Sequence, residues 1–465
     1  MKTKRGWMML IAVLAALSLI AAACGDDDDD TSAGGDDGAA ADDGGDDGAA
    51  GDDGGDDGAA ADDGAAADDG AAGDDGAAAD DGAAGDDGAA GDDGGEPSGE
   101  PIKVMSITPV ETTLGPSPEI FAYAGVYEQY INDRGGVAGR PLEVITCDGR
   151  GDPNEAAACA REAVNEGVVA IVSHFEYDMS VAIPILEEAG IALIGSCCPV
   201  TPAEFSSPNN FIFGSTNTMQ HAAIKRMADD GCESPAIVYL ELFTDYLTGL
   251  ANQATSYYGV FEDNLIITSV PGDPGDFSAQ AAVASDGTDC IWVSLGKDPF
   301  AAFLAGLRTV GGDQRIYGSQ GNLDPSIVEE YPDLTEGAVV LNAYPNLVDG
   351  VWDETRAAID EYGVPEDTRL NSLAGLSTWA AYVAFTDIVE MIDGEITADS
   401  FLETLRQQDA YQSMWGPVID FSVAEGPMPG FPRVLVLEVT FDLIEDGEFV
   451  PTGEFLDSTE AVQAG

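Results

Sequence analysis

Histidine and cysteine are the residue types here that most readily do chemistry, and the sequence holds few of them. Its 465 residues include two histidines, His174 and His221, and seven cysteines. A Ser-His-Asp arrangement would depend on one of those two histidines, and we expect His221 to be a packing or surface residue of a helix. The sequence contains no nucleophile elbow, P-loop, dinucleotide fingerprint or HExxH motif. It therefore predicts a protein that is not an enzyme and needs no cofactor.

Cys24 ends a segment with the features of a secretory signal. Three of residues 2–5 are basic, residues 8–20 are apolar, and three alanines precede the cysteine. The apolar run is short for a bilayer span, which needs about 20 residues. The segment resembles the lipobox of bacterial lipoproteins, whose cysteine is lipidated and becomes the new N-terminus. An ordinary cleaved signal with an incidental cysteine is the alternative. We predict a signal peptide over residues 1–24, export, and anchoring by Cys24 on the extracytoplasmic side, at the cell surface or in the periplasm.

Four of the later cysteines are candidates for disulfides, which persist in exported proteins. Cys147 ends a predicted strand and Cys159 lies in the next predicted helix, so a local bridge is expected. Cys232 precedes one predicted strand and Cys290 begins another. The topology implied by the family resemblance given below makes these strands neighbours, so a second bridge is expected. Connectivity cannot be fixed from sequence alone.

Cys197 and Cys198 are adjacent in the sequence. Three states are open to them: a vicinal disulfide, two thiols, or metal coordination together with His174. Zinc needs a complete ligand set at tetrahedral spacing, and the sequence offers one nearby histidine and no paired motif. We therefore predict no metal site.

Residues 25–99 are almost entirely Gly, Asp and Ala, with the unit Asp-Asp-Gly-Ala-Ala recurring. Such a segment has no apolar side chains for a core, and its like charges repel. We predict a disordered tether with an r.m.s. span of about 50 Å. Calcium binding by the Asp pairs is the alternative, but the repeat lacks the spacing and the distal Glu of a calcium loop.

The net charge of −69 is shared between the tether and the rest of the chain. From Pro101 onward there are 57 acidic and 14 basic residues, a net charge of −43. A surface this acidic excludes nucleic acid as a partner. It says little about a small ligand, because a binding site sets its own local field.

The remaining residues alternate between short apolar runs and helix-like stretches, and they exceed one typical domain. Predicted strands lie at 102–107, 142–146, 168–172, 191–194, 236–239, 265–270, 290–293, 316–318, 338–342 and 434–441. Predicted helices lie at 118–132, 154–165, 179–189, 221–228 and 377–392. This alternation indicates parallel sheets covered by helices on both faces. The pattern restarts after Met219, so we predict two α/β units in series.

Several segments resemble the leucine/isoleucine/valine-binding proteins, which are type I periplasmic binding proteins serving ABC transporters. The similar segments are YINDRGGVAGRPLEV at 130–144, DPNEAAA at 152–158, PILEEAGIALI at 184–194, DFSAQ at 276–280, and 379–388. Their order and spacing cover nearly all of residues 101–440. The resemblance implies two Rossmann-like lobes joined by a hinge that the chain crosses three times. We place lobe 1 at 101–218 plus about 346–428, and lobe 2 at 219–345 plus about 429–455.

The implied mechanism is capture of a small molecule between the lobes. Ligands of open parallel sheets bind beyond the carboxyl ends of the strands, and two facing lobes close around a ligand like a hinge. The resemblance implies that an ABC permease reads the closed form of a monomeric protein. The alternatives are a sensor that feeds a signalling receptor and a stalked surface-binding protein.

The ligand is predicted from positions that the resemblance aligns. Family members that bind amino acids use an acidic residue on lobe 2, and that position falls at or near Gln320. A neutral amide cannot make the charge-assisted bond that selects an ammonium group. Aromatic residues would instead wall an apolar or aromatic molecule. The predicted ligand is a small organic molecule, namely a branched-chain amino acid, an amide or a related compound, and the amide at Gln320 disfavours an ordinary amino acid. For each residue, local packing is the alternative to the predicted ligand-binding role. The predicted ligand-binding residues are Thr113, Phe175, Tyr177, Cys197, Cys198, Thr201, Tyr246, Gln320 and Asn322.

Overall fold

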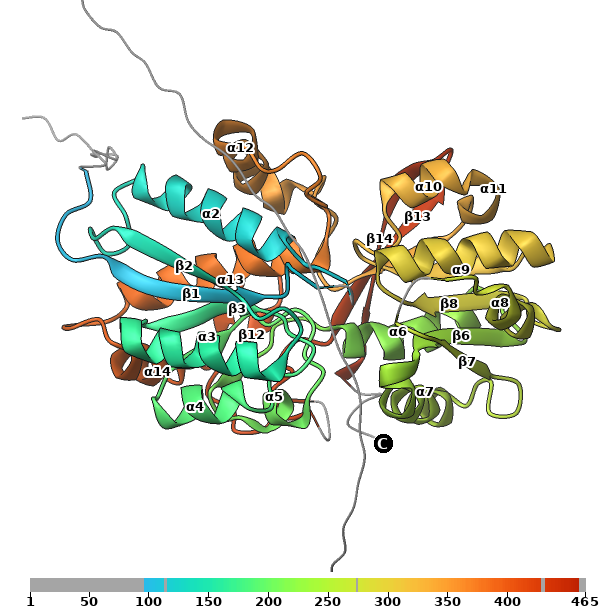
Figure 1. Ribbon diagram of the computed structural model, residues 1–465, viewed down its shortest axis with the longest axis horizontal. Helices are drawn as coiled ribbons and strands as arrows, with labels where there is room; N and C mark the ends of the chain where they lie inside the picture. Colours follow the sequence, from blue (N-terminus) through green and yellow to red (C-terminus); the bar gives the residue numbers. More distant parts are fainter. Residues whose placement is uncertain (1–95, 113–114, 273–274, 428–430, 460–465) are drawn as a thin grey trace, which may run out of the picture. The chain divides into compact units, whose positions relative to one another are not determined.

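The computed structural model describes residues 96–112, 115–272, 275–427 and 431–459. The signal peptide, Cys24, nearly all of the predicted tether and Thr113 lie outside these residues. The described residues belong to one compact unit, Asp87–Gly465. Two separate parallel sheets form its framework (Figure 1).

The first sheet has five parallel strands in the order β2-β1-β3-β4-β5. These strands are β1 (Ile102–Thr108), β2 (Leu142–Asp148), β3 (Ala170–His174), β4 (Ala192–Ile194) and β5 (Asn210–Phe211). Their side chains alternate between two apolar layers, because successive residues of a strand point to opposite faces. Ile102 and Val104 pack on one face, and Met105 and Ile107 on the other.

Helices cover both faces of the first sheet. The helices of its amino-terminal part are α2 (Glu119–Asn132), α3 (Pro153–Glu166), α4 (Ala182–Glu188) and α5 (Pro202–Ser206). Apolar residues of α2 pack on one face, and those of α3 and α4 on the other. The start of α3 follows from its sequence: Asp152 accepts hydrogen bonds from Asn154 N and Glu155 N, and Pro153 occupies the first turn.

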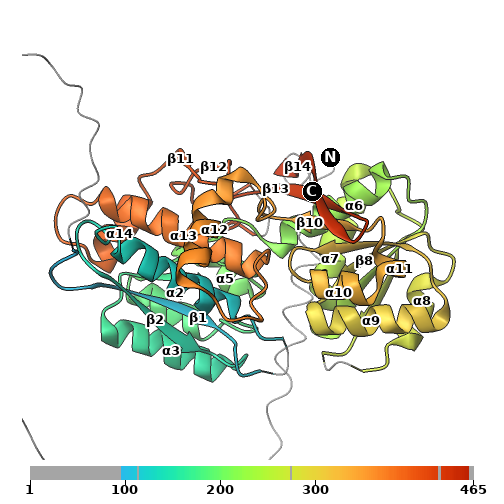
Figure 2. The same ribbon diagram turned by 90° about the horizontal axis from the view of Figure 1, so that it is seen from above.

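A later part of the chain returns to the same lobe. It contains η2 (Gly350–Trp352), α12 (Asp353–Tyr362), α13 (Leu373–Glu390), α14 (Ala398–Leu405), β11 (Tyr411–Gln412) and β12 (Val418–Ile419). Helix α13 packs beside α2, although the two are far apart in sequence (Figures 1 and 2). Lobe 1 therefore consists of two separate chain segments.

The second sheet has seven strands in the order β14-β13-β10-β9-β8-β6-β7. The parallel strands are β6 (Pro235–Leu240), β7 (Ile266–Val270), β8 (Cys290–Ser294), β9 (Arg315–Ser319) and β10 (Val339–Asn342). The strands β13 (Glu438–Glu445) and β14 (Glu448–Asp457) form an antiparallel hairpin on β10. This sheet is the framework of lobe 2.

Helices also cover both faces of the second sheet. They are α6 (Thr216–Asp229), α7 (Thr244–Tyr258), α8 (Ser278–Ser285), α9 (Lys297–Val310), α10 (Pro325–Glu330) and α11 (Pro332–Thr335), with the short η1 (Glu241–Phe243) before α7. Residues of α6 and α7 pack on one face, and those of α8 to α11 on the other. No helix of the described ranges combines the length and the hydrophobicity of a membrane span.

The chain passes between the sheets three times: after β5, after β10 and before β13. The first and third passages touch, because Ile212 forms a parallel bridge with Val434. One apolar core runs through this region and includes Phe213, Tyr344 and Val436. The three passages therefore form one packed connection between the lobes.

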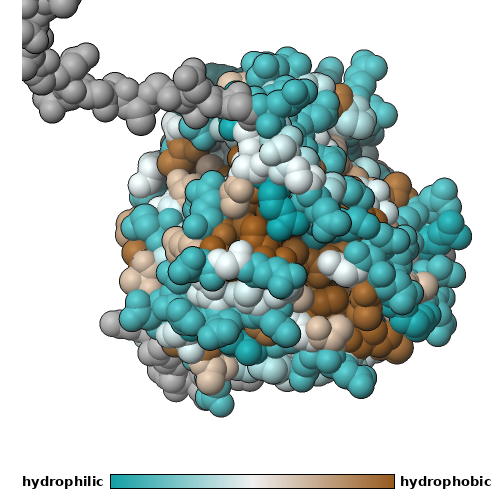
Figure 3. Space-filling view, turned by 90° about the vertical axis from the view of Figure 1, so that its left-hand side faces the viewer, coloured by the Kyte–Doolittle hydropathy of each residue, from teal (hydrophilic) through white to brown (hydrophobic). Residues whose placement is uncertain are grey.

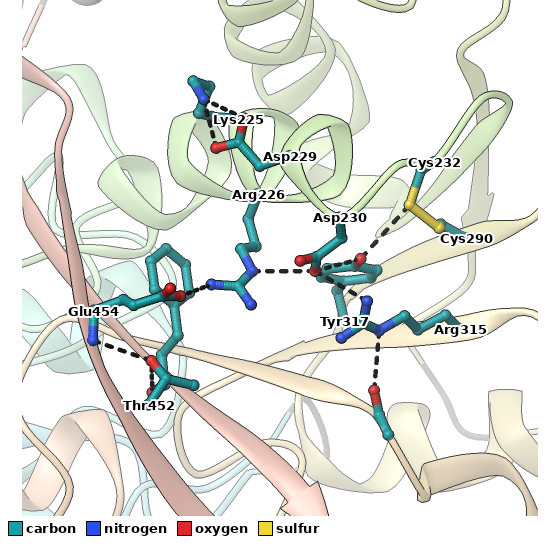
Figure 4. Close-up of polar contacts among 12 residues, drawn as sticks. Lys225, Arg226, Asp229, Asp230, Cys232, Cys290, Arg315, Tyr317, Thr452 and Glu454 are labelled. Atoms are coloured by element: carbon teal, nitrogen blue, oxygen red, sulfur yellow. Dashed lines mark hydrogen bonds and ion pairs between the residues drawn. A yellow bond between two sulfur atoms is a disulfide. The ribbon is translucent and has the colours of Figure 1, made fainter.

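Helix α6, which follows the first passage, is fixed to the rest of lobe 2 by polar contacts (Figure 4). Asp230, just after α6, accepts a hydrogen bond from Tyr317 at 2.8 Å and pairs with Arg226 at 3.0 Å and Arg315 at 3.2 Å. Arg226 also pairs with Glu454 of β14. Helix α6, strand β9 and the terminal hairpin are thus held together.

The outer surface of lobe 1 is mostly hydrophilic, with apolar residues visible in places between the polar ones (Figure 3). This agrees with the excess of acidic residues in the sequence.

The predicted fold class is confirmed, with differences at individual elements. Each predicted strand before residue 343 is present within about two residues of its expected ends, as boundary uncertainty leads one to expect. The last prediction was less accurate: residues 434–437 belong to the third passage, and the strand begins at Glu438. The sequence patterns did not indicate the helices α5, α7 to α12 and α14, or the short or exposed strands β5, β11, β12 and β14.

Both expected disulfides are present. Cys147 is joined to Cys159, and Cys232 is joined to Cys290. The second bridge links the segment before β6 to the start of β8, at the amino ends of neighbouring strands. The separations along the chain are 12 and 58 residues.

We expect the longer bridge to contribute more to stability, because closing a longer loop removes more entropy from the unfolded chain. The pair Cys232→Ser and Cys290→Ser should lower the free energy of unfolding by about 4 kcal/mol, and Cys147→Ser and Cys159→Ser by about 3 kcal/mol. Urea unfolding monitored by fluorescence measures both. A larger loss for the shorter loop would contradict the expectation.

Candidate ligand cavity

A cavity of about 370 Å³ lies between the lobes. Its walls are built by loops that follow the carboxyl ends of strands in both sheets: β1, β3 and β4 in lobe 1, and β6 to β9 in lobe 2. The carboxyl ends of parallel strands lie at the same edge of their sheet, so the loops that follow them converge there in each lobe. The lining residues named below come from these loops and from the segments before α6 and α13.

The lobe 1 wall is aromatic. The rings of Phe175 and Tyr177, which follow β3, meet edge to face with centroids 5.0 Å apart. Tyr177 donates a hydrogen bond to the carbonyl oxygen of Gly115 at 3.0 Å, which ties the loop after β3 to the loop after β1. Burial raises the pKa of Tyr177 well above its ordinary value, so the phenol stays neutral. Cys198 and Val200 continue this wall.

The lobe 2 wall is also apolar and aromatic. It includes Trp292 of β8, Phe243 and Tyr246. The Trp292 indole donates to Gln220 Oε1 at 3.0 Å, and Tyr246 donates to Asn217 Oδ1 at 2.6 Å. These bonds satisfy the polar atoms of the rings, so the rings can present apolar faces to a ligand.

Aromatic packing also joins the two lobes beside the cavity. Tyr246 of α7 lies 6.1 Å from the ring of Phe205 in α5 and 5.6 Å from the ring of Phe431. The rings of Phe205 and Phe431 are 4.6 Å apart. This three-ring cluster brings together the two lobes and the third passage.

The cations of the cavity wall are already paired. Arg369 Nη2 donates to Glu119 Oε2 at 3.0 Å, and its Nε donates to the other carboxylate oxygen. Lys297 Nζ lies 2.6 Å from Asp324 Oδ2. Burial opposes the charge on Arg369, but the hydrogen bond to Glu119 and the negative charges of Glu119 and Asp324 together raise its pKa. These pairs leave the inner wall close to neutral, and the further charged residues of the lining, Asp298 and Asp367, are carboxylates at exposed positions.

Arg369 also connects the lobes. It lies in the segment before α13 of lobe 1, and its Nη1 donates to the carbonyl oxygen of Gly321 in lobe 2 at 3.3 Å. The side chain thus spans the mouth of the cavity from Glu119 to the loop after β9.

The structure brings together five of the predicted ligand-binding residues: Phe175, Tyr177, Cys198, Tyr246 and Asn322 line the cavity.

Three further predicted residues lie beside the wall without lining it. Cys197 is fully buried behind Cys198. Thr201 caps helix α5 by accepting a hydrogen bond from Glu204 N. Gln320 is buried and donates to the carbonyl oxygen of Tyr344 at 3.1 Å, so its amide holds the second passage. These contacts give Thr201 and Gln320 structural roles.

Several residues that pair charges or supply much of the apolar wall were not predicted from the sequence: Glu119, Met219, Leu240, Phe243, Trp292, Lys297 and Arg369. Most of them sit at or just beyond a predicted strand, or at the start of a predicted helix. The strand-end rule applied to every predicted strand would have found Leu240, Trp292 and Lys297. Arg369 comes from the second segment of lobe 1, which sequence spacing does not place near the cavity.

Two buried acidic side chains stand behind the lobe 1 wall. Glu204 Oε1 lies 3.5 Å from His174 Nε2, and neither side chain is exposed. Glu176 lies between the two aromatic wall residues in sequence and accepts a hydrogen bond from Gly151 N at 3.0 Å. Burial raises the pKa of Glu176 from 4.5 to about 8.

The geometry gives no support to the metal alternative for the adjacent cysteines. Among the described residues, the group whose donor atoms converge closely enough for a metal is Cys232, Asp289 and Cys290. Two of these three are joined in a disulfide.

Two α/β lobes, joined by three passages and enclosing a cavity at their strand ends, define a two-lobed solute-binding protein. The sequence profile of the periplasmic binding protein family matches residues 122–429. The chain therefore belongs to this family, whose members are extracytoplasmic solute-binding proteins, and the resemblance inferred from the sequence is confirmed.

Individual relatives agree with this assignment. The chain is 25% identical over 289 residues to the leucine-, isoleucine-, valine-, threonine- and alanine-binding protein of Pseudomonas aeruginosa, covering 60% of this chain and 74% of the relative. Among solved structures, the fatty acid ABC transporter substrate-binding protein of Thermomonospora curvata has a TM-score of 0.65 at 18% identity, covering 78% and 94% of the two chains. A leucine-binding protein of Thermotoga maritima has a TM-score of 0.61 at 18% identity, covering 77% and 99%.

The raised pKa of Glu176 predicts a pH dependence of stability. The folded state keeps a proton on Glu176 up to about pH 8, whereas the unfolded chain releases it near pH 4.5. The folded state binds more protons between these values, so stability should fall as the pH rises from about 5 to 8, by at most about 1.4 kcal/mol per pH unit.

Glu176→Gln should remove this contribution and flatten the dependence of the free energy of unfolding on pH. Glu188→Gln, at an exposed position of α4, is the matched control and should keep the slope of the parent protein. Urea unfolding at several pH values provides the measurement. Equal slopes for both variants would contradict the buried, protonated state of Glu176.

Proposed function

We propose that this protein captures a small organic molecule with a largely apolar or aromatic body and delivers it to an ABC permease. The observation that carries the proposal is the cavity between the lobes, with aromatic walls from both sides. A molecule bound there would be in contact with strand-end loops of both sheets, so its binding energy would favour the closed arrangement of the lobes.

The charge pairs support a ligand with few charges. Glu119 is paired with Arg369, and Lys297 is paired with Asp324. A charged ligand group that binds to one of these four residues would therefore have to displace its present partner. An α-amino acid would need a carboxylate for its ammonium group. The buried Gln320 offers an amide that holds Tyr344, and the lining carboxylates outside the two pairs, Asp298 and Asp367, are exposed. Apolar amides and aromatic or aliphatic compounds with one polar group therefore fit the cavity better than an ordinary amino acid.

The screen must include branched-chain amino acids, because the Pseudomonas relative is named as binding them. It must also include fatty acids, because the Thermomonospora protein is named as a fatty acid transporter's substrate-binding protein. A thermal-shift screen of the purified protein against branched-chain amino acids, their amides, aromatic acids and fatty acids tests the proposal. A ligand at 100 times its dissociation constant adds about 2.7 kcal/mol of stability. We expect the largest shift from apolar or aromatic compounds. A shift with polar compounds alone would overturn the proposed class.

For the compound that gives the largest shift, Phe243→Ala should lower affinity about tenfold, because an aromatic face of the cavity is lost. Leu242→Ala is the matched control: Leu242 is adjacent in sequence but 69% exposed and outside the cavity lining. Titration calorimetry measures both variants. Equal affinities for the two would place the ligand elsewhere.

We also propose that the protein is a lipoprotein held to the membrane through Cys24, with residues 25–99 as a tether. The support is the signal-like sequence and the acidic low-complexity segment that follows it. The tether would let the folded unit stand off from the anchor and reach the permease.

Cys24→Ser should move the protein from the membrane fraction to the soluble fraction, because the residue that would carry the acyl chains is lost. Cell fractionation followed by immunoblotting measures the distribution. A variant that stays with the membrane would refute anchoring through this residue. Deletion of residues 25–99 after the cysteine is the control, and that protein should remain in the membrane fraction.

A further inference from the structure

Two neighbouring cysteines form part of the lobe 1 cavity wall. Cys197 and Cys198 lie between β4 and α5, and their sulfur atoms are 2.7 Å apart. This is well inside the separation of two sulfur atoms in van der Waals contact, so the side chains face each other. Cys198 lines the cavity, and Cys197 is fully buried behind it.

The other four cysteines of the described residues are all joined in disulfides. The protein of an extracytoplasmic family works where disulfides persist. Under the same conditions, two thiols in contact, one of them open to a cavity, have both the geometry and the access needed for oxidation. We propose that Cys197 and Cys198 form a vicinal disulfide and that this bond is part of the ligand cavity wall.

The surroundings of the two sulfurs favour a disulfide over a metal site. The His174 and Glu204 side chains lie nearby in the same buried layer, but together with the cysteines they do not form a group whose donors converge on one point within the described residues. Tyr177, Tyr344 and Arg369 are the other polar groups close enough to Cys198 to interact electrostatically. None of these three is a common ligand for zinc.

The two cysteines differ in reactivity. Burial, followed by the contact with Cys198, raises the pKa of the Cys197 thiol. A thiol that stays protonated is a poor nucleophile, and Cys197 is also closed to solvent. Cys198 is therefore the residue that attacks first.

The oxidation is a thiol–disulfide exchange with a low-molecular-weight disulfide or an oxidised dithiol oxidoreductase. The Cys198 thiolate attacks one sulfur of that disulfide, forms a mixed disulfide and releases one thiol. The Cys197 sulfur then attacks the Cys198 sulfur, loses its proton and releases the second thiol. The protein loses two protons and two electrons, and the oxidant gains both.

The bond would stiffen a segment that is fixed at both ends. Gly195 has a φ of +77°, and an added Cβ would lie 2.2 Å from the Cβ of Ala381, so the backbone there packs closely on α13. At the other end Thr201 caps α5. A disulfide between these points would restrict the conformation of the loop. It would also expose to the cavity a disulfide sulfur, which cannot donate a hydrogen bond, in place of a thiol. The inference that this bond affects a ligand rests on the proposed function. The inference that the bond forms does not.

The test is thiol trapping of the full chain in the exporting cell. Cells are quenched with acid, the protein is denatured in N-ethylmaleimide, and the peptides are analysed by mass spectrometry without reductant. We expect the peptide with Cys197 and Cys198 to carry no maleimide and to be lighter than the dithiol by two hydrogen atoms. The two established disulfides in the same digest are the positive controls. Maleimide on both residues, with the two controls unlabelled, overturns the proposal.

A second measurement tests the position of the bond in the cavity wall. The reduced protein, kept folded, is exposed briefly to maleimide, and labelling is compared between the two residues. We expect Cys198 to be labelled first, because its sulfur is open to the cavity. Faster labelling of Cys197 overturns the assignment to the wall, independently of any result on ligand binding.

Discussion

The parallel arrangement of the strands is the constraint on which the cavity depends. In a parallel sheet every strand ends at the same edge, so the following loops gather there. In this protein two such edges face each other across one cavity, and the loops after seven strands, β1, β3, β4 and β6 to β9, build its wall. The residues that line it come from positions between 115 and 369, and none of them would meet without this topology.

The cavity also requires that the carboxyl-end edges of the two sheets keep facing each other, although the lobes are separately folded. Three passages of the chain, packed into one apolar core around Phe213, Tyr344 and Val436, provide the connection. On the lobe 2 side, Asp230 and its three partners fix α6 to β9 and the terminal hairpin (Figure 4). Two further contacts join the lobes at the cavity: Arg369 bonds to Gly321, and Tyr246 packs on Phe205 and on Phe431 of the third passage. A connection made by a few chain passages is the arrangement that hinge closure needs.

The cavity wall combines apolar surface with polar atoms that mostly have partners; Asn217 Nδ2 is buried without one. The hydroxyl of Tyr177, the indole of Trp292 and the hydroxyl of Tyr246 are each hydrogen-bonded to protein, and Arg369 and Lys297 are each paired with a carboxylate. An unpaired polar group in such a place would cost free energy and would attract water or a polar ligand. Because these groups are satisfied, the wall offers mainly aromatic and aliphatic surface, and the vicinal cysteines extend it.

The sequence by itself predicted the fold class, most of the strands, five of the helices, the family, and the two cysteine pairs that the structure joins. These follow from local patterns: runs of apolar β-branched residues, the cap formed by Asp152 and Pro153, and cysteines in or beside neighbouring elements. The sequence also placed Phe175, Tyr177, Cys198, Tyr246 and Asn322 at the cavity, because strand ends converge in this fold. Only the tertiary structure decided that Gln320 and Thr201 serve the framework, since their hydrogen bonds go to backbone groups of neighbouring segments. The sequence alone likewise could not predict the ion pair between Arg369 and Glu119. The two residues are 250 positions apart, and their contact depends on how α13 packs on α2.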